Sequence, residues 1–316
     1  MNGIIVLNWN GFVDTIECLK SVFKLKEPNV SIVVVDNGSS DNSVAYIEEY
    51  LQQEVGSPNA ISQNIARYEM SSGQEIFFIR NPSNDGYAGG NNVGIKFLLS
   101  FPEIQNIWVL NNDTIVDSYA LTYMVEKINI NPQFGAVGSC VLYLETPERI
   151  WAACGGRYSK LTCGSKNIDL NLDLANQEKS EIEIERIMDY IAGASVLFTR
   201  KALEGVGLFC EDYFLYFEEP DWCNRAKKLG YKLGYASKSI VYHGVGKSTD
   251  KYNKTLSRFY SFRWLQLKNR IKFSAKFHPL SLPIVFGYIL VTEIIAASKF
   301  AFKKLTKNIG HKMQNG

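Results

Sequence analysis

The chain has 316 residues, 46% of them hydrophobic, and a formal net charge of +2. A chain of this length and composition buries a large core, which excludes a disordered protein. Its six cysteines have no CxxC pair and no zinc-ligand spacing, so free thiols in a reducing compartment are expected. Since the N-terminus also lacks the pattern of a secretory signal, we expect a cytoplasmic protein.

Short apolar runs alternate with helical patterns through the first 130 residues. The expected strands are Gly3–Trp9, Ser31–Asp36, Glu75–Arg80 and Asn106–Leu110. The expected helices are Asp14–Phe23, Asp41–Gln53, about Gly89–Leu99 and Ser118–Ile130. Continuous apolar strands that alternate with helices indicate an α/β fold, with a mostly parallel central sheet covered by helices on both faces.

Polar side chains follow these strands at their carboxyl ends, where parallel sheets bind ligands. Asn8, Asp36, Arg80 and the stretch 111–113 all fall there. Asp36 can accept hydrogen bonds from a base or a ribose, with Asn8 and Asn10 as donors beside it. An Asx-type turn before the next helix is the alternative for Asp36.

Asp113 and His243 are candidates for a metal site. Asp113 lies on a strand-end loop, where a hard divalent cation can bridge to a diphosphate. His243 follows the apolar strand Ser239–Tyr242, which can deliver it to the same edge of the sheet. A turn aspartate and a structural histidine are the alternatives.

An acidic stretch at the start of an expected helix supplies candidate general bases. Glu218, Glu219 and Asp221 lie within four positions, although acids in a first helical turn also complement the helix dipole. Asp221 and Arg225 can share a helix face and orient an acceptor. Trp222 either stacks on an acceptor sugar or belongs to the core.

The pattern weakens after Val137. The polar, acidic stretch Asn171–Glu185 predicts an exposed loop or insertion. Gly193 and Ala194, which precede the expected strand Val196–Thr199, complete the candidate acceptor site.

Two nucleotide-binding motifs can be excluded. The run Gly246-Lys247-Ser248 resembles the end of a P-loop, but no glycine-rich arch precedes it. The glycines between Gly86 and Gly94 miss the GxGxxG spacing, so dinucleotide binding is not expected.

The C-terminal region differs from the rest in charge. From Lys247 onward there are 14 lysines and arginines against two acidic residues. Aromatic residues interleave with these cations before the mostly apolar segment 280–297, which favours an anionic membrane surface over nucleic acid. Its apolar core 284–297 is short and contains Glu293, so a helix lying on the membrane is preferred to a spanning one. Packing on the catalytic domain or on a second subunit is the alternative.

Five motifs in order resemble those of the family 2 glycosyltransferases, most closely the bacterial rhamnosyltransferase-like branch. The resemblance covers about residues 3–246. The motifs are Asn8-Trp9-Asn10-Gly11, the run 33–41 (VVVDNGSSD), the run 84–94 (NDGYAGGNNVG), Leu110-Asn111-Asn112-Asp113 and the run 216–223 (YFEEPDWC).

This resemblance implies a GT-A fold, a nucleotide-diphosphate sugar donor, a divalent cation (Mg²⁺ or Mn²⁺) and inversion at the anomeric carbon. Asp36 matches the base-binding aspartate and Asp85 the donor-binding aspartate. Asp113 matches the last residue of the DxD-type metal motif, although Asn111 replaces its first aspartate. Glu219 matches the catalytic base, with Glu218 as its rival, and His243 matches a histidine that completes the metal site in some relatives. The remaining candidates for the donor site are Asn37, Gly86, Asn91 and Asn112.

The expected protein is an inverting, metal-dependent glycosyltransferase of cell-surface polysaccharide synthesis. We expect a GT-A domain over residues 1–246 and a membrane-associated region over 247–316, which place the protein at the inner face of the plasma membrane. The first candidate donor is dTDP-L-rhamnose, and the acceptor is a glycan or a polyprenyl-linked glycan. A UDP-sugar donor and a catalytically silent nucleotide- or glycan-binding module are the alternatives. No nucleic-acid partner is expected, and a homodimer is left open.

Overall fold

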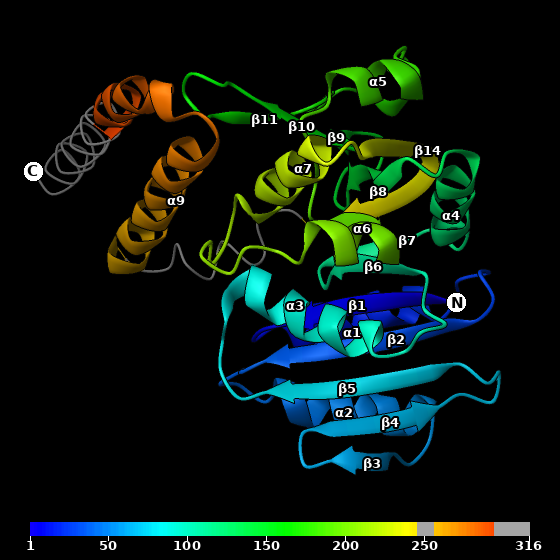
Figure 1. Ribbon diagram of the computed structural model, residues 1–316. Helices are drawn as coiled ribbons and strands as arrows, with labels where there is room; N and C mark the ends of the chain where they lie inside the picture. Colours follow the sequence, from blue (N-terminus) through cyan, green and yellow to red (C-terminus); the bar gives the residue numbers. More distant parts are fainter. Residues whose placement is uncertain (245–255, 294–316) are drawn as a thin grey trace, which may run out of the picture.

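The computed structural model describes residues 1–244 and 256–293 of the chain (Figure 1). The first half contains β1 (Asn2–Asn8), α1 (Phe12–Val22), β2 (Val30–Asn37), α2 (Ser43–Glu54), β3 (Asn59–Ser62), β4 (Ile65–Glu69), β5 (Glu75–Asn81), α3 (Gly86–Leu99), β6 (Asn106–Asn111), β7 (Thr114–Val116) and α4 (Ala120–Ile130). The second half contains β8 (Phe134–Tyr143), β9 (Ile150–Ala153), β10 (Gly155–Tyr158), β11 (Ser165–Asn167), α5 (Glu181–Ile187), β12 (Tyr190–Ile191), β13 (Ser195–Thr199), α6 (Arg200–Val206), α7 (Glu218–Lys228), β14 (Lys232–His243), α9 (Leu256–Phe277) and a helix over residues 282–293.

One large sheet runs through the molecule in the order β3-β4-β5-β2-β1-β6-β13-β8-β14-β7, with β9 paired to β8. Neighbouring pairs among β5, β2, β1 and β6 are parallel, as is the pair β8 and β14. The strand β13 runs antiparallel to both β6 and β8. The parallel strands on either side of β13, namely β5, β2, β1 and β6 on one side and β8 and β14 on the other, therefore point in the same direction. The expected α/β fold with a mostly parallel sheet is therefore confirmed.

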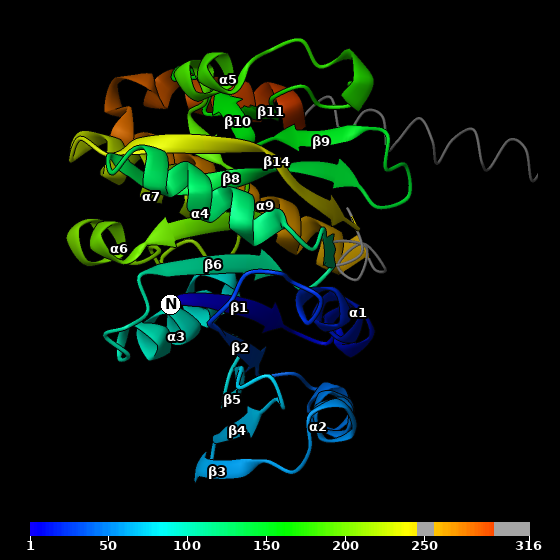
Figure 2. The same ribbon diagram turned by 90° about the vertical axis from the view of Figure 1, so that its right-hand side faces the viewer.

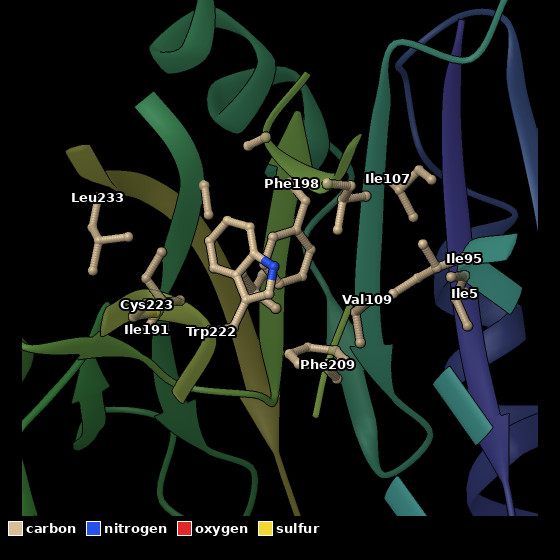
Figure 3. Packing of buried hydrophobic residues seen from close by; sticks show 14 of the residues in the cluster. Ile5, Ile95, Ile107, Val109, Ile191, Phe198, Phe209, Trp222, Cys223 and Leu233 are labelled. Carbon is tan, nitrogen blue, oxygen red and sulfur yellow. The ribbon is translucent and has the colours of Figure 1, made fainter. Parts of the chain in front are cut away.

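Helices cover both faces of this sheet and bury a core on each (Figures 1 and 2). Side chains alternate along β1, so Ile5 packs on one face while Ile4 and Val6 pack on the other. The first core includes residues of α3, α6 and α7, and the second includes residues of α1, α2 and α4. Figure 3 shows part of the first core, where Trp222 of α7 packs against Phe198 of β13.

The expected elements of the first half are present, with bounds shifted by a few residues. The expectation for Asn171–Glu185 is wrong at its C-terminal end, because α5 begins at Glu181. Ser180 and Glu183 form a reciprocal capping box there, and Ile184 is fully buried. Two ion pairs from Lys127, to Glu181 and Glu185, further fix α5 on the domain. The acidic residues at this end therefore cap α5 and form ion pairs with Lys127, and they do not belong to an exposed loop.

The helix α9 lies beside the loop that precedes α7, and the chain then turns into the helix 282–293 (Figure 1). Phe273 of α9 and Val285 are fully buried in one small cluster with Tyr213. Arg263 donates to the two carboxylate oxygens of Glu293 at 2.7 and 2.8 Å. The one acidic residue of the apolar segment 284–297 thus has a cationic partner. Within the described ranges, none of the helices has both the length and the apolarity to cross a bilayer. The expectations for residues 245–255 and 294–316 lie outside the described residues.

Candidate active site

A pocket of about 570 Å³ opens at the carboxyl ends of the central strands. Its wall is formed by strand-end residues from β1, β2 and β6, by the start of α3, by the loop before β13 and by the start of α7. The predicted site residues that line it are Asn37, Gly86, Asn112, Asp113, Gly193, Ala194, Glu218, Glu219 and His243. The fold thus brings together side chains that lie more than 200 residues apart in the sequence.

Asp36 is buried at the end of β2 within a network of short hydrogen bonds. Its Oδ2 accepts from Asn8 Nδ2 at 2.7 Å and from Ser39 Oγ at 2.6 Å, and its Oδ1 accepts from the Ser39 amide at 3.0 Å. The network continues through Thr15, which donates to Asn8 and accepts from Asn112 Nδ2 at 2.9 Å. Asp36 therefore ties the strand ends together beneath the pocket, and Asn112 is the member of the network that lines it.

The loop before α3 is organised by Asn37. Its side chain donates to the Asn84 side chain and the Gly86 carbonyl, and it accepts from Asn81. Gly86 has a φ of +73°, and a Cβ there would overlap the Phe214 carbonyl oxygen. Glycine is therefore required for the close approach of α3 to the loop before α7.

Asp85 is exposed beside this loop, where hydrogen bonds from Asn81 (2.8 Å) and Ser83 (2.7 Å) lower the pKa of its carboxyl group. Three other predicted donor-site residues lie outside the pocket wall. Asn10 accepts from the amides of Ser40 and Asp41, Arg80 forms an ion pair with Glu48, and buried Asn91 donates to the Tyr87 carbonyl.

Asp113 and His243 meet at one side of the pocket, as expected from their strand-end positions. The pairing of β7 with β14 sets His243 opposite Thr114, so that His243 Nε2 lies 3.2 Å from Asp113 Oδ1. Both side chains are almost fully buried, and His243 Nδ1 has no hydrogen-bond partner. Among residues 1–244 and 256–293, no group of three or more histidine, cysteine, aspartate and glutamate side chains is arranged to hold a metal ion. Asp113 and His243 are therefore candidates for two ligands of a divalent cation, because a carboxylate and an imidazole both bind such ions.

Glu218 and Glu219 open α7 at the pocket wall after a strained turn. Tyr216 and Phe217 both have positive φ, 69° and 79°, a conformation that costs free energy in bulky residues. Burial raises the pKa of Glu219 to about 7, opposed by backbone hydrogen bonds from Glu219 itself and Gly193. Burial and the nearby Glu219 raise the pKa of Glu218 well above its usual range. Burial thus favours the protonated form of both carboxyl groups, and Glu219 is the candidate base.

The loop before β13 fixes the position of Glu219. A Cβ on Gly193 would overlap the Glu219 carboxylate, so the backbone approaches this side chain directly. Tyr87 donates to the Gly193 carbonyl at 2.7 Å and holds the loop from the other side. Gly193 thus lies next to the candidate base, and both Gly193 and Ala194 line the pocket.

Asp221, Trp222 and Arg225 point into the protein rather than along the pocket wall. Asp221 is fully buried and pairs with Arg225 (2.7 Å) and Lys276 of α9 (2.6 Å). Arg225 also donates to the carbonyls of Val206, the last residue of α6, and of Leu208. Trp222 donates to the Gly207 carbonyl from within the core. These residues anchor α7, which leaves Glu218 and Glu219 as the acids of this stretch on the pocket wall.

The sequence did not indicate several residues of the wall. They are Tyr87, Trp151, Tyr158, Asn167, Tyr190 and, from α9, Gln266 and Arg270. Trp151 packs edge-on against His243, with ring centroids 4.7 Å apart. The helix α9 also holds the loop before Glu218, because Asn269 donates to the Leu215 and Tyr216 carbonyls.

The sequence of this chain is similar to those of known glycan-synthesising enzymes. The family model for glycosyl transferase family 2 matches residues 4–166. The hexosyltransferase Agl10 of low-salt glycan biosynthesis from Haloferax volcanii is 21% identical over 74% of this chain and 73% of its own length. The poly-β-1,6-N-acetyl-D-glucosamine synthase of Staphylococcus epidermidis is 29% identical over 90% of this chain, which spans only 59% of that enzyme.

Two solved structures share the fold at low sequence identity. The mannosyltransferase PcManGT from Pyrobaculum calidifontis, solved with GDP-mannose and Mn²⁺, has a TM-score of 0.55 at 15% identity over 95% of this chain and 78% of its own. Residues 1–349 of Staphylococcus aureus TarS give 0.51 at 14% identity over 79% of this chain and 63% of the other. The fold is therefore that of the GT-A glycosyltransferases. The chain belongs to glycosyl transferase family 2.

Proposed function

We propose that this protein is an inverting glycosyltransferase that moves a sugar from a nucleotide-diphosphate donor to a hydroxyl group of a glycan or lipid-linked glycan. The observation that carries the proposal is the position of Glu219. It is an acid with a pKa of about 7, held by a neighbouring backbone loop in a pocket that also contains the Asp113–His243 pair.

In the proposed reaction, Glu219 removes the proton from the acceptor hydroxyl as the oxygen attacks the anomeric carbon. The bond to the nucleoside diphosphate breaks in the same step, and inversion follows from attack opposite the leaving group. Glu218 is the rival base, and burial and the nearby Glu219 raise its pKa well above its usual range. A second acid that retains its proton beside the base avoids two buried negative charges at one site.

Asp113 and His243 are the residues that would hold a divalent cation in this pocket. Bound there, it would neutralise charge on the leaving diphosphate. The Mn²⁺ in the mannosyltransferase complex makes Mn²⁺ or Mg²⁺ the cations to test.

For the donor, dTDP-L-rhamnose is our first candidate, because the motifs most resemble the rhamnosyltransferase-like branch, and a UDP-sugar is the second. Titration calorimetry with dTDP, UDP and GDP in the presence of Mn²⁺ tests the donor site. We expect one nucleotide to bind at micromolar concentration and the others at least ten-fold more weakly. Absence of binding by all three would contradict the proposed function.

We expect the ionisation of Glu219 to control the pH dependence of transfer. Because its pKa is raised to about 7 and the reaction needs the ionised carboxylate, kcat/KM should fall about ten-fold per pH unit below pH 7. Steady-state rates between pH 5 and pH 9 measure this. A profile that stays flat down to pH 5 would show that the base has an ordinary carboxyl pKa.

We also propose that the protein is cytoplasmic and docks on the inner face of the plasma membrane through its C-terminal region. Support comes from apolar side chains that are exposed around the helix 282–293, namely Trp264, Leu280, Ile284, Phe286, Leu290 and Val291. Exposed apolar side chains concentrated in one segment of the chain favour an interaction surface, whereas singly scattered ones are normal.

Vesicle flotation is expected to recover most of the protein with vesicles that contain about 30% anionic lipid. Replacing Phe286 and Leu290 with serine should reduce the bound fraction several-fold without changing nucleotide affinity. Replacement of Ile182, an exposed apolar residue of α5, is the matched control. Equal binding by both variants and the wild type would show that these side chains do not bind the membrane.

A further inference from the structure

Arg270 brings a cation from the C-terminal helix into the wall of the active-site pocket. It is the only lysine or arginine among the described residues of that wall, which otherwise carries the acids Asp113, Glu218 and Glu219. Its Nε is buried and has no hydrogen-bond partner. Across residues 1–244 and 256–293, the structure shows no ion pair to this guanidinium.

Its neighbours hold the guanidinium in place without neutralising it. The Arg270 guanidinium carbon lies 5.3 Å from the centre of the Tyr288 ring, within the range of a cation–π contact. Asn269, the preceding residue, is bonded to the loop before α7, so the backbone of α9 is fixed at this point. A positioned guanidinium with free donors is suited to bind a phosphate.

Other cations of α9 are already used by the protein. Lys276 pairs with Asp221, Lys272 donates to the Asp212 carbonyl and Arg263 pairs with Glu293. These three contacts fasten the C-terminal helices together and onto the domain. Arg270 differs because its charge is left for a ligand in the pocket.

Tyr288 connects this position to the exposed apolar surface. It belongs to the helix 282–293, whose Ile284, Phe286, Leu290 and Val291 are about half exposed or more, while Val285 is buried against Phe273. Arg270 therefore lies between the acid-containing pocket, whose wall it joins, and a helix with exposed apolar side chains, which it contacts through Tyr288. This order matches the parts of an amphiphilic sugar phosphate.

We propose that Arg270 binds the phosphate of a lipid-linked acceptor, with the acceptor sugar at Glu219 and the lipid tail in the apolar layer contacted by the helix 282–293. The inference rests on the proposed function and deepens it by naming the acceptor class. The donor diphosphate is assigned to Asp113 and His243, which line the same pocket. Arg270 is thus a binding residue for the acceptor, separate from the donor site.

The test measures binding of farnesyl diphosphate, as a probe of a phosphate with a lipid tail, to the full-length protein by calorimetry. EDTA is present throughout, so that the diphosphate of the probe cannot bind through a metal at Asp113 and His243. Farnesol and inorganic pyrophosphate supply the tail alone and the phosphates alone. The variants are Arg270→Gln, Arg270→Lys and, as a matched control, Lys268→Gln at an exposed position on the same helix.

We expect Arg270→Gln to weaken farnesyl diphosphate binding ten-fold or more, Arg270→Lys to weaken it less, and Lys268→Gln to leave it within two-fold. Binding of farnesol should be unchanged in all variants. The proposal is overturned if Arg270→Gln binds the probe as well as the wild type does, if farnesol binding falls equally, or if pyrophosphate binds as tightly as the probe. Failure of every nucleotide to bind would instead contradict the proposed function, while the probe titration, which contains no nucleotide, would still test Arg270.

Discussion

Replacing Glu219 with glutamine is expected to lower the rate of sugar transfer by about 10²–10⁴-fold, the usual contribution of a positioned general base. Glutamine keeps the size of the side chain but cannot accept the proton of the acceptor hydroxyl. Nucleoside diphosphate affinity should change less than three-fold, because the proposed donor contacts are at Asp113 and His243. Transfer assays and titration calorimetry on the same preparation separate the two effects.

Glu218→Gln is the matched control for this experiment. Burial and Glu219 raise the pKa of Glu218 well above its usual range, which favours its neutral form, and glutamine is a neutral side chain of the same size. Its rate should therefore stay within about ten-fold of the wild type. The reverse result, with an active Glu219→Gln and an inactive Glu218→Gln, would assign the base to Glu218. If both variants keep full activity, the base lies outside this pair.

Replacing Asp113 with alanine is expected to weaken nucleoside diphosphate binding in Mn²⁺ by about 100-fold or more and to abolish most turnover. The substitution removes the carboxylate of the Asp113–His243 pair, which is proposed to hold the cation against the diphosphate. With EDTA, the variant and the wild type should bind the nucleotide with similar, weak affinity, because neither then holds the cation. Calorimetry with and without Mn²⁺ measures the difference.

Asp117→Asn provides the control, since Asp117 is an exposed acid four positions further along the chain. It should bind the nucleotide and Mn²⁺ as the wild type does. If the wild-type protein binds the nucleotide with the same affinity in Mn²⁺ and in EDTA, no cation at Asp113 and His243 contributes to nucleotide binding. The role of Asp113 would then be limited to its contact with His243.

The sequence predicts the central sheet well, because its strands are buried on both faces and appear as continuous apolar runs. Ile4, Ile5 and Val6 are all fully buried, for example, although they face opposite sides. The sequence predicts the region after residue 137 poorly. There β8 pairs with both β13 and β14, which lie far from it in the sequence, so its register cannot be predicted from local patterns. The helix α5 is short and rich in acids, so its composition is similar to that of an exposed loop.

Part of the site was also accessible from the sequence, since residues that follow parallel strands meet at one edge. Asp113 and His243 lie in contact, and Glu218 and Glu219 open α7 at the same pocket. Their catalytic and metal-binding roles stay predictions. Composition alone could not show that Asp221 turns inward to pair with Lys276, because that partner lies 55 positions away. The same holds for Arg270, whose place in the wall depends on the packing of α9.

The most direct test of the central claim is release of nucleoside diphosphate by the full-length protein from UDP-, dTDP- and GDP-sugars, with Mn²⁺ and a lipid-linked acceptor fraction. We predict that nucleoside diphosphate is released from one donor, that release depends on the acceptor and on the metal, and that release is lost in Glu219→Gln. If the nucleotide binds but no donor is turned over, or if Glu219→Gln releases it as fast as the wild type, the pocket is not a glycosyl-transfer site with Glu219 as its base. Nucleotide binding without turnover would favour the catalytically silent module.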